Sequence, residues 1–374
     1  MFASVFGNIF GLKELEELYI FDIVIPLRYQ KQFQGPYAGI EGIRKMVGTE
    51  KSRRPHVGTI VKPKVGLAPK EWANVAYEAY RGGLDLVKDD ENLVDQDFCR
   101  WEERLHEVVK VIEKAGKETN QNHLYSCNIS DKYDRMVERI DYLNNMGLQK
   151  NVVIMLDTYI IGVGALQNIL ELTRRYKFAT HGHRAGYAAA NRGNFGINFQ
   201  IYEKFYRLFG IDQMHIGTGV GKMEGSPLAI KRLHDIAEKN TLEEKLYLGS
   251  LAMEFAPHIK PMLSIASGGI DAGKVDALVA LHGKNTNIQA GAGVHGHIEG
   301  TFGGAKSMRQ AVNAVMLGIP GPTYAREHKE LAAALRQWGY FDPAKIRKEL
   351  EKEKETAKKI EKAMMKKGRK AMEL

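Results

Sequence analysis

A lysine and two carboxylates stand together in this chain at the end of a short apolar run. The run Leu84–Val87 leads directly into the pentad Lys88–Asn92, which reads Lys-Asp-Asp-Glu-Asn. Clustered carboxylate oxygens suit a hard divalent cation, whereas a lysine amine is a poor ligand for one. Carbon dioxide adding to a neutral lysine amine forms a carbamate, which converts a cation into an oxygen ligand. The pattern is therefore compatible with a metal site on Lys88, Asp90 and Glu91, and also with a surface turn whose acid caps a helix.

Similar polar groups follow other apolar runs. In chain order, six runs end in Lys62 and Lys64, Lys88 to Glu91, His181 to Arg184, His215 to Lys222, Ser267 to Gly269, and Gly291 to Gly293. Each group alone has a simpler explanation, as an exposed lysine, a core histidine or a tight glycine corner. Backbone amides freed by glycine after the last two strands of a barrel are nevertheless a recurring phosphate site. Together the groups favour a pocket for an anionic substrate.

The elements that must position these groups alternate regularly after Arg53. Strand-like runs are Val57–Lys64, Leu84–Lys88, Leu124–Ile129, Val152–Asp157, Ala179–His183, Gln213–Gly217, Met262–Ala266 and Asn287–Ala290. Amphipathic helical stretches are Pro69–Tyr80, Phe98–Ala115, Lys132–Asn145, Leu166–Tyr176, Gln200–Phe209, Pro227–Glu238, Gly273–Leu281 and Ala305–Leu317. Eight successive βα units predict an α/β fold, a closed (β/α)8 TIM barrel, rather than an open doubly wound sheet. The polar strand ends should then meet at one mouth.

The chain divides into three parts on this pattern. Residues 1–53 lack the βα rhythm and form a short N-terminal segment that we expect to pack against the barrel. Residues 54–322 form the barrel, and residues 323–374 form a helical extension with a basic tail. From Lys345 onward the tail holds 12 Lys or Arg and 6 Glu at helical spacing, with no aromatic residue for base stacking. We interpret it as a solvated terminal helix rather than a nucleic-acid-binding element.

Composition excludes several classes of protein. The two cysteines, Cys99 and Cys127, cannot build a disulfide framework or a cysteine-rich zinc site. No apolar run approaches the roughly 20 residues that span a bilayer, so we expect no membrane partner and a cytoplasmic location. The net charge is +9, and the excess outside the tail suits a doubly anionic sugar phosphate.

Five blocks of the sequence resemble, in order and at similar spacing, the signature blocks of the large chain of ribulose-1,5-bisphosphate carboxylase/oxygenase (RuBisCO). They are Gly58–Leu67, Gly82–Asn92, His183–Ala185, His215–Gly225 and Ser267–Gly269. The likeness covers nearly the whole chain up to about Leu317, including Ser4–Gly11 and Phe33–Pro36. The first strand and the stretch Gln289–His297 are most similar to the archaeal, form III branch.

The resemblance implies a carboxylase that converts ribulose bisphosphate and carbon dioxide to 3-phosphoglycerate, with an oxygenase side reaction that uses O2. It implies that Lys88 carries a carbamate and, with Asp90 and Glu91, holds Mg2+ as a Lewis acid. Among form III relatives it implies a role in nucleotide (AMP) salvage.

The resemblance also implies a role for each remaining site residue. Lys62, crowded by other cations, would release and pass a proton readily, His183 would transfer a proton during hydration, and Lys222 would ride a mobile loop and stabilise the new carboxylate. Substrate-binding residues would be Lys64, Arg184, His215, Ser267, Gly268, Gly269, Gln289, Ala290, Gly291 and Ala292. The methyl group of Ala292, where glycine is usual, would weaken a backbone phosphate contact if φ there is positive.

Family members carry a smaller domain before the barrel and pair head to tail, so that a neighbouring subunit completes each active site. Most of that domain is absent from this sequence. We expect either a fragment or a partner polypeptide that supplies the missing part, within a homodimer or a larger oligomer. Two rival functions remain open: a RuBisCO-like enolase or isomerase acting on a sugar phosphate, and an inactive partner subunit or interaction protein. Lys222 favours the carboxylase over the first rival, because RuBisCO-like relatives commonly lack that lysine.

Overall fold

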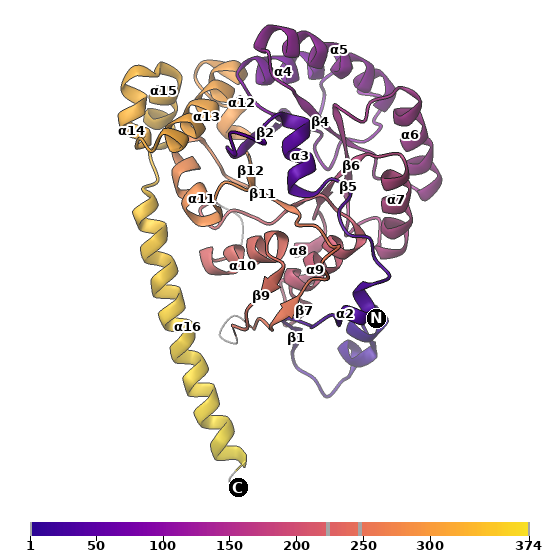
Figure 1. The fold of residues 1–374 in the computed structure, drawn as a ribbon, viewed down its shortest axis with the longest axis vertical. Helices are drawn as coiled ribbons and strands as arrows, with labels where there is room; N and C mark the ends of the chain where they lie inside the picture. Colours follow the sequence, from indigo (N-terminus) through magenta and orange to yellow (C-terminus); the bar gives the residue numbers. More distant parts are fainter. Residues whose placement is uncertain (1, 222–224, 246–248, 373–374) are drawn as a thin grey trace.

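The structure is a computed structural model that describes residues 2–221, 225–245 and 249–372 (Figure 1). At its centre eight parallel strands close into a barrel, in the order β2-β3-β4-β5-β6-β8-β11-β12. The strands are β2 (His56–Ile60), β3 (Leu86–Lys88), β4 (Leu124–Asn128), β5 (Val152–Asp157), β6 (Ala179–His183), β8 (Gln213–His215), β11 (Leu263–Ser267) and β12 (Thr286–Gln289). The predicted (β/α)8 barrel is confirmed.

Helices surround the barrel in the predicted alternation. They are α4 (Pro69–Arg81), α5 (Trp101–Thr119), α6 (Tyr133–Asn145), α7 (Val163–Arg175), α9 (Phe199–Phe209), α10 (Pro227–Glu238), α11 (Val275–His282) and α13 (Gly300–Leu317).

The expected bounds of β2 were wrong, because the strand ends at Ile60 instead of Lys64. Pro63 cannot donate a ladder hydrogen bond, so the strand cannot continue through it to Lys64. Similarly, β8 ends at His215, two residues before Gly217, whose φ is +94°.

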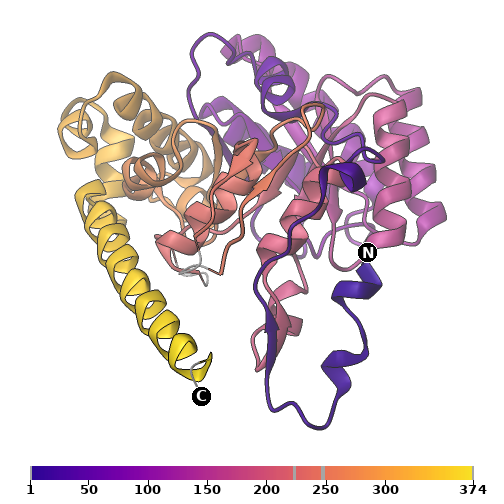
Figure 2. The same ribbon diagram turned by 60° about the horizontal axis from the view of Figure 1, so that its bottom comes forward.

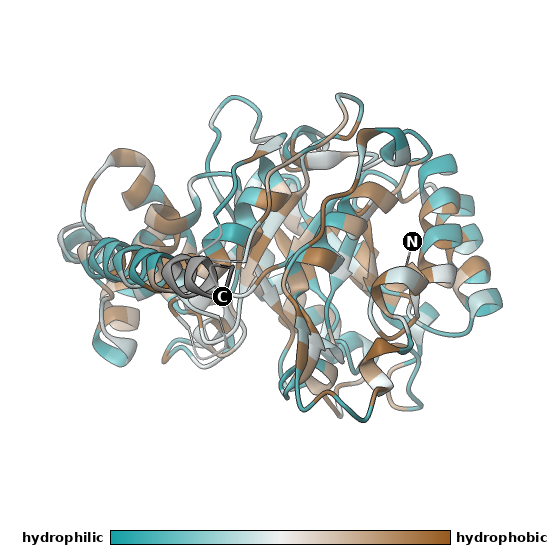
Figure 3. Ribbon diagram, turned by 90° about the horizontal axis from the view of Figure 1, so that it is seen from below, coloured by the Kyte–Doolittle hydropathy of each residue, from teal (hydrophilic) through white to brown (hydrophobic). Residues whose placement is uncertain are grey.

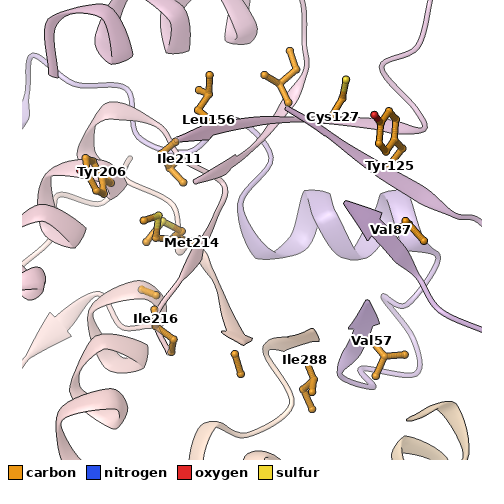
Figure 4. Packing of buried hydrophobic residues seen from close by; sticks show 14 of the residues in the cluster. Val57, Val87, Tyr125, Cys127, Leu156, Tyr206, Ile211, Met214, Ile216 and Ile288 are labelled. Carbon is orange, nitrogen blue, oxygen red and sulfur yellow. The ribbon is translucent and has the colours of Figure 1, made fainter. Parts of the chain in front are cut away.

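Alternation along each strand separates two environments. Side chains on the outer face of the strands pack against the helices; Figure 4 shows Val57, Val87, Tyr125, Cys127, Leu156 and Ile288 in this layer. All six are fully buried, which for an aliphatic side chain contributes about 1.5 to 3 kcal/mol. Because successive strand residues point to opposite faces, their neighbours turn into the barrel. Lys88, His181 and Gln213 are among those inward-facing residues.

The N-terminal segment covers the amino end of the barrel. Helix α3 (Gly39–Val47) places Ile40, Ile43 and Val47 against the inward-facing side chains Leu86 and Leu124. The cluster is completed by Val153, Ala179 and Leu263. This helix therefore closes the end of the barrel opposite the polar strand ends.

Several short elements escaped prediction. Strand β1 (Leu18–Ile20) pairs in parallel with β7 (Phe195–Ile197), and β9 (Thr241–Leu242) pairs with β10 (Met253–Glu254). The short helices are α1 (Phe2–Val5), η1 (Asn8–Gly11), α2 (Leu27–Gln30), α8 (Tyr187–Asn191), η3 (Ala272–Lys274) and α12 (Ala292–His295). Elements of two to five residues carry too few positions for a periodic pattern to mark them.

The C-terminal extension is helical, as predicted. It comprises α14 (Gly321–Tyr324), η4 (Ala325–Glu327), α15 (Lys329–Trp338) and α16 (Pro343–Met372). Ile346 near the start of α16 is fully buried against Ala277 and Leu281 of α11, and the helix then runs away from the barrel (Figures 1 and 2). Much of its length is hydrophilic in Figure 3. Among the described residues, no helix is both long and apolar enough to cross a membrane.

Candidate active site

Polar residues end seven of the eight barrel strands. These terminal residues are Lys88, Asn128, Asp157, His183, His215, Ser267 and Gln289, in β3, β4, β5, β6, β8, β11 and β12. The parallel registers align neighbouring ends, pairing Asp157 with His183 and Ser267 with Gln289. The carboxyl ends of the strands thus bring these side chains to one mouth, where the catalytic face of such a barrel lies.

Asp90 and Glu91 lie against two lysines at this mouth. The Lys62 Nζ atom is 2.6 Å from Asp90 Oδ2, and Lys64 Nζ is 3.1 Å from Asp90 Oδ1 and 3.0 Å from Glu91 Oε1. Burial opposes ionisation of Asp90, but the hydrogen bond and charge of Lys62 outweigh it and lower the pKa of that carboxyl. Asp90 is therefore available as an anionic oxygen ligand. Lys62 therefore shares the Asp90 carboxylate with one neighbouring cation, Lys64.

Lys88 is only 1% exposed, and its Nζ donates to the Asp89 carbonyl oxygen at 2.7 Å. Removal from water lowers the pKa of this amine, against the opposing charges of Glu91, Asp90 and Asp157. A lowered pKa increases the fraction of neutral amine, the form that reacts with carbon dioxide. Lys88 thus has the environment that carbamate formation requires.

Asp89 is turned away from the mouth. Its carboxylate accepts hydrogen bonds from the Tyr125 hydroxyl at 2.7 Å and the backbone N–H of Asn128 at 2.9 Å, and Arg104 Nε lies 3.0 Å from Oδ1. Asp89 and Arg104 are both fully buried. This anchor fixes the start of the loop after β3, so that its two neighbours Asp90 and Glu91 face the mouth.

His183 is oriented by a residue that sequence reasoning missed. Its Nδ1 lies 2.8 Å from Asp157 Oδ1, and its Nε2 points toward Glu91 Oε2, 3.9 Å away. Such a carboxylate fixes the tautomer and ring orientation of a proton-transferring histidine. Asn128 ends β4 and Asp157 ends β5, the two predicted strands to which the sequence analysis assigned no polar group. Their places at strand ends were the signal that could have identified them as site residues.

His215 belongs to a chain of hydrogen bonds. Its Nδ1 lies 2.7 Å from Ser267 Oγ, and its Nε2 lies 2.8 Å from Nε2 of His181. Burial lowers the pKa of both imidazoles well below the usual value, and the neighbouring charges of Lys88 and His183 act in the same direction. Both rings are therefore neutral at physiological pH.

The glycine-rich turns approach one another closely. Gly268 and Gly269 have φ values of +109° and +73°, and a Cβ atom at Gly221 would lie 2.0 Å from the Gly268 carbonyl oxygen. Only glycine fits that approach. A Cβ at Gly291 would lie 3.5 Å from Lys62 Cε, so the last turn also reaches the lysines of the mouth. Lys222, the predicted loop lysine, lies outside the described residues.

Four further predicted residues lie at or just after the ends of β6 and β12. The Arg184 guanidinium stacks over the Phe199 ring at 5.0 Å, and the Ala290 carbonyl oxygen accepts from the Thr59 hydroxyl at 2.7 Å. Ala292 begins α12 and has no positive φ, so the strain expected from its methyl group is absent. The amide group of Gln289 is buried and makes no hydrogen bond in the described part of the chain, which leaves it available to a ligand.

Comparison with known proteins identifies the family. Residues 39–338 match the model of the ribulose bisphosphate carboxylase large chain, catalytic domain. The chain belongs to the RuBisCO large-chain family. It is 40% identical to the ribulose bisphosphate carboxylase of Archaeoglobus fulgidus over 346 residues, which cover 92% of this chain and 77% of that protein. The corresponding protein of Methanocaldococcus jannaschii is 41% identical over 337 residues, 90% of this chain and 77% of the relative.

Solved RuBisCO structures share the fold. The dimeric archaeal RuBisCO of Hyperthermus butylicus superposes with a TM-score of 0.84 at 40% identity, covering 91% of this chain and 78% of that one. The octameric RuBisCO of Pyrococcus horikoshii gives a TM-score of 0.81 at 37% identity, covering 90% and 75%. These archaeal relatives agree with the branch that the sequence blocks resemble.

The donor set at the mouth fits the magnesium ion that RuBisCO proteins use. Within the described residues, no cluster of three or more His, Cys, Asp or Glu side chains could hold a metal ion. Asp90 and Glu91 supply only two carboxylates, and a carbamate on Lys88 would supply the third oxygen donor. Lysine ammonium groups now neutralise the two acids at 2.6 to 3.1 Å, which shows that this position attracts cations. The residues therefore fit a hard cation once Lys88 is modified.

Proposed function

We propose that this chain is the catalytic part of a ribulose-1,5-bisphosphate carboxylase. The observation that carries the proposal is the buried, easily neutralised amine of Lys88 beside Asp90 and Glu91, facing His183 and the lysines across one barrel mouth. A mouth with two lysines and an arginine suits a substrate that carries two phosphates.

The metal centre would be held by Lys88 as its carbamate, Asp90 and Glu91. Mg2+ bound there supplies Lewis acidity toward the oxygens of the sugar. Lys88, as the carbamate, takes the proton from C3 of ribulose bisphosphate and so begins enolisation. Lys62 passes a proton to and from the sugar oxygens. Its Nζ donates a hydrogen bond to Asp90, which holds the amine at the mouth.

His183 acts in the later hydration step. Asp157 holds the Nδ1 side of its ring, which leaves Nε2 toward the mouth to exchange a proton with water or substrate. Lys64 neutralises substrate oxygens from beside Glu91, and Arg184 grips a phosphate with its planar donor fork. Lys222 stabilises the new carboxylate as carbon dioxide adds.

The sugar bisphosphate is held mainly by the strand ends opposite these groups. Ser267, Gly268 and Gly269 offer a hydroxyl and backbone groups to one side of the sugar bisphosphate. Gln289 to Ala292 contact its other side. His215 has both ring nitrogens engaged by protein partners, so we infer that it acts on the ligand through Ser267.

Several wider features of the family extend the proposal. The chain would act as a homodimer or larger oligomer, because similar archaeal enzymes are described as dimeric and octameric. The proposal also includes the division into residues 1–53, 54–322 and 323–374, an oxygenase side reaction and a role in nucleotide salvage.

The test is carboxylation with labelled carbon dioxide. Purified protein with Mg2+ and ribulose bisphosphate should form 3-phosphoglycerate that carries the label, either alone or after addition of a RuBisCO N-terminal domain. A rearranged, unlabelled sugar phosphate would instead support a RuBisCO-like isomerase. No turnover of the sugar under either condition would contradict the carboxylase proposal.

A further inference from the structure

A row of five polar side chains crosses the barrel interior beneath the mouth. Asn287 Nδ2 lies 3.4 Å from Gln213 Oε1, and Gln213 Nε2 lies 3.2 Å from His181 Nδ1. His181 Nε2 then lies 2.8 Å from His215 Nε2, and His215 Nδ1 lies 2.7 Å from Ser267 Oγ. The row begins on β12, passes through β8 and β6, and ends on β11 at the substrate mouth.

The side-chain amide of Gln213 decides which atom donates in each hydrogen bond from Gln213 to Ser267. A glutamine Nε2 can only donate, so His181 Nδ1 must accept and the single ring proton of His181 must sit on Nε2. That proton is donated to His215 Nε2, which places the proton of His215 on Nδ1. His215 in turn donates to Ser267 Oγ. The Ser267 hydroxyl hydrogen is then free to point elsewhere.

Burial keeps the row in this form. His181 and Gln213 are fully buried and Asn287 is 1% exposed, so water does not compete for their hydrogen bonds. Because both imidazoles are neutral, each carries one proton, and reversing one bond forces reversal of the others. Ser267 is the member of the row that opens to the mouth, since it is partly exposed.

We propose that Gln213 is a positioning residue that makes the Ser267 hydroxyl a hydrogen-bond donor toward the bound substrate. Phosphate and sugar oxygens accept hydrogen bonds, so a serine that donates binds them and a serine whose hydrogen is spent on His215 does not. Asn287 supports the same direction by donating to Gln213 Oε1. The identity of the ligand rests on the proposed function, whereas the direction of the row does not.

The decisive variant is Gln213→Glu, which keeps the size of the side chain and, once ionised, can only accept hydrogen bonds. A carboxylate at this position would take the proton of His181 on Nδ1, so His181 Nε2 would accept from His215 Nε2. His215 Nδ1 would then accept from Ser267. Nitrogen NMR of the histidine-labelled protein distinguishes protonated from unprotonated ring nitrogens and reports this change directly.

In the unaltered protein we expect His181 with its proton on Nε2 and His215 with its proton on Nδ1, and in Gln213→Glu we expect both assignments to exchange. The opposite tautomers in the unaltered protein would overturn the proposal even if the variant does not fold. Retention of the proton on His181 Nε2 in a folded variant whose substituted side chain is ionised, as shown by its carbon NMR shift, would also overturn it. Gln167→Glu on α7, which makes the same chemical change outside the row, should leave both rings unaltered.

The functional consequence is tested on KM for ribulose bisphosphate. Loss of one hydrogen bond to a charged oxygen should raise KM about tenfold to a hundredfold in Gln213→Glu, with a smaller change in kcat. In a Ser267→Ala background the same substitution should have little further effect, because it acts through the hydroxyl. Equal effects in the two backgrounds would refute a role through Ser267. If the protein turns over no ribulose bisphosphate, the proposed function fails, while the NMR result still decides the direction of the row.

Discussion

The two ends of the barrel are built from the same eight strands but obey different rules. At the amino end, inward-facing Leu86 and Leu124 meet Ile43 of α3 in an apolar cluster. At the carboxyl end, the next inward-facing residue of β3 is Lys88, and that of β4 is Ser126 followed by Asn128. One end buries apolar surface and supports the fold, while the other keeps charged and polar groups that can act on a ligand.

The position of one large cavity shows that shape alone does not locate chemistry. In the described part of the chain it has a volume of about 1310 Å3 and lies at the amino end, beside α3, among Met46, Lys150, Lys177 and Lys260. Within the described residues, no two of its lining side chains form a salt bridge, in contrast to Lys62 and Asp90 at the mouth. Convergence of polar strand ends at the carboxyl mouth is the better guide to function.

The largest expected effect is a loss of activity at the carboxyl end without a comparable loss of stability. Lys88→Met should lower carboxylation at least about a thousandfold, because it removes the proposed carbamate donor for a metal ion that would supply several kcal/mol to the transition state. The free energy of unfolding should change by less than about 1 kcal/mol, since a buried amine is replaced by an apolar chain of similar length. Carboxylation assays and chemical denaturation measure the two quantities. A variant that retains activity would break the distinction between the two ends.

At the amino end we expect a loss of stability without a comparable loss of activity. Ile43→Ala should reduce the free energy of unfolding by about 2 to 4 kcal/mol, because the fully buried side chain leaves a cavity under α3. The value of kcat should stay within about twofold in the remaining folded protein. Ile9→Ala, at a residue that is 49% exposed, serves as the control and should change neither quantity. A large loss of kcat in Ile43→Ala would show that the ends are coupled.

Glu203 is a buried acid outside the mouth, and its pKa is shifted in the opposite direction to the pKa of Asp90. Glu203 on α9 is fully buried, its oxygens make no hydrogen bond within the described residues, and burial raises its pKa well above 4.5 against the charges of Arg184, Arg207 and Arg232. The folded state therefore keeps a proton that the unfolded state loses above pH 4.5, so this group reduces stability as pH rises from there. Glu203→Gln should raise the free energy of unfolding by about 1 to 2 kcal/mol at pH 7.

That gain should shrink toward zero as the pH falls to 4.5. Denaturant titrations of both proteins at several pH values measure it, with Glu244→Gln at an exposed position as the control. A pH-independent difference would mean that the carboxyl of Glu203 is already ionised in the folded protein.

The smallest effect concerns the C-terminal helix. Glu353 Oε2 accepts a hydrogen bond from the Leu228 amide at 2.9 Å, in the first turn of α10. A carboxylate at a helix N-terminus contributes about 0.3 to 1 kcal/mol, so Glu353→Gln should lower stability by that amount and speed hydrogen exchange at Leu228. Glu351→Gln on the same helix, which loses only an exposed pair with Lys354, should leave exchange at Leu228 unchanged.

The fold and the positions of most site residues followed from the sequence, because both depend on local patterns. Apolar runs predicted the strands, and a charged group at the end of a run, as at Lys88 or His183, predicted the mouth. Pairings between strands depend on register instead, so the contact of His181 with His215 and Gln213 could not be read from spacing. The closing role of α3 was also hidden, because an amphipathic helix does not reveal which surface it covers.

The most direct test of the proposed metal centre is to trap labelled carbon dioxide on the protein and to find the modified residue by mass spectrometry. We expect Mg2+-dependent label on the peptide that contains Lys88, absent from Lys88→Met and reduced in Asp90→Asn. Label on Lys62 or Lys64 instead, or label on Lys88 that does not depend on Mg2+ or on Asp90, would contradict a magnesium site built on a modified Lys88.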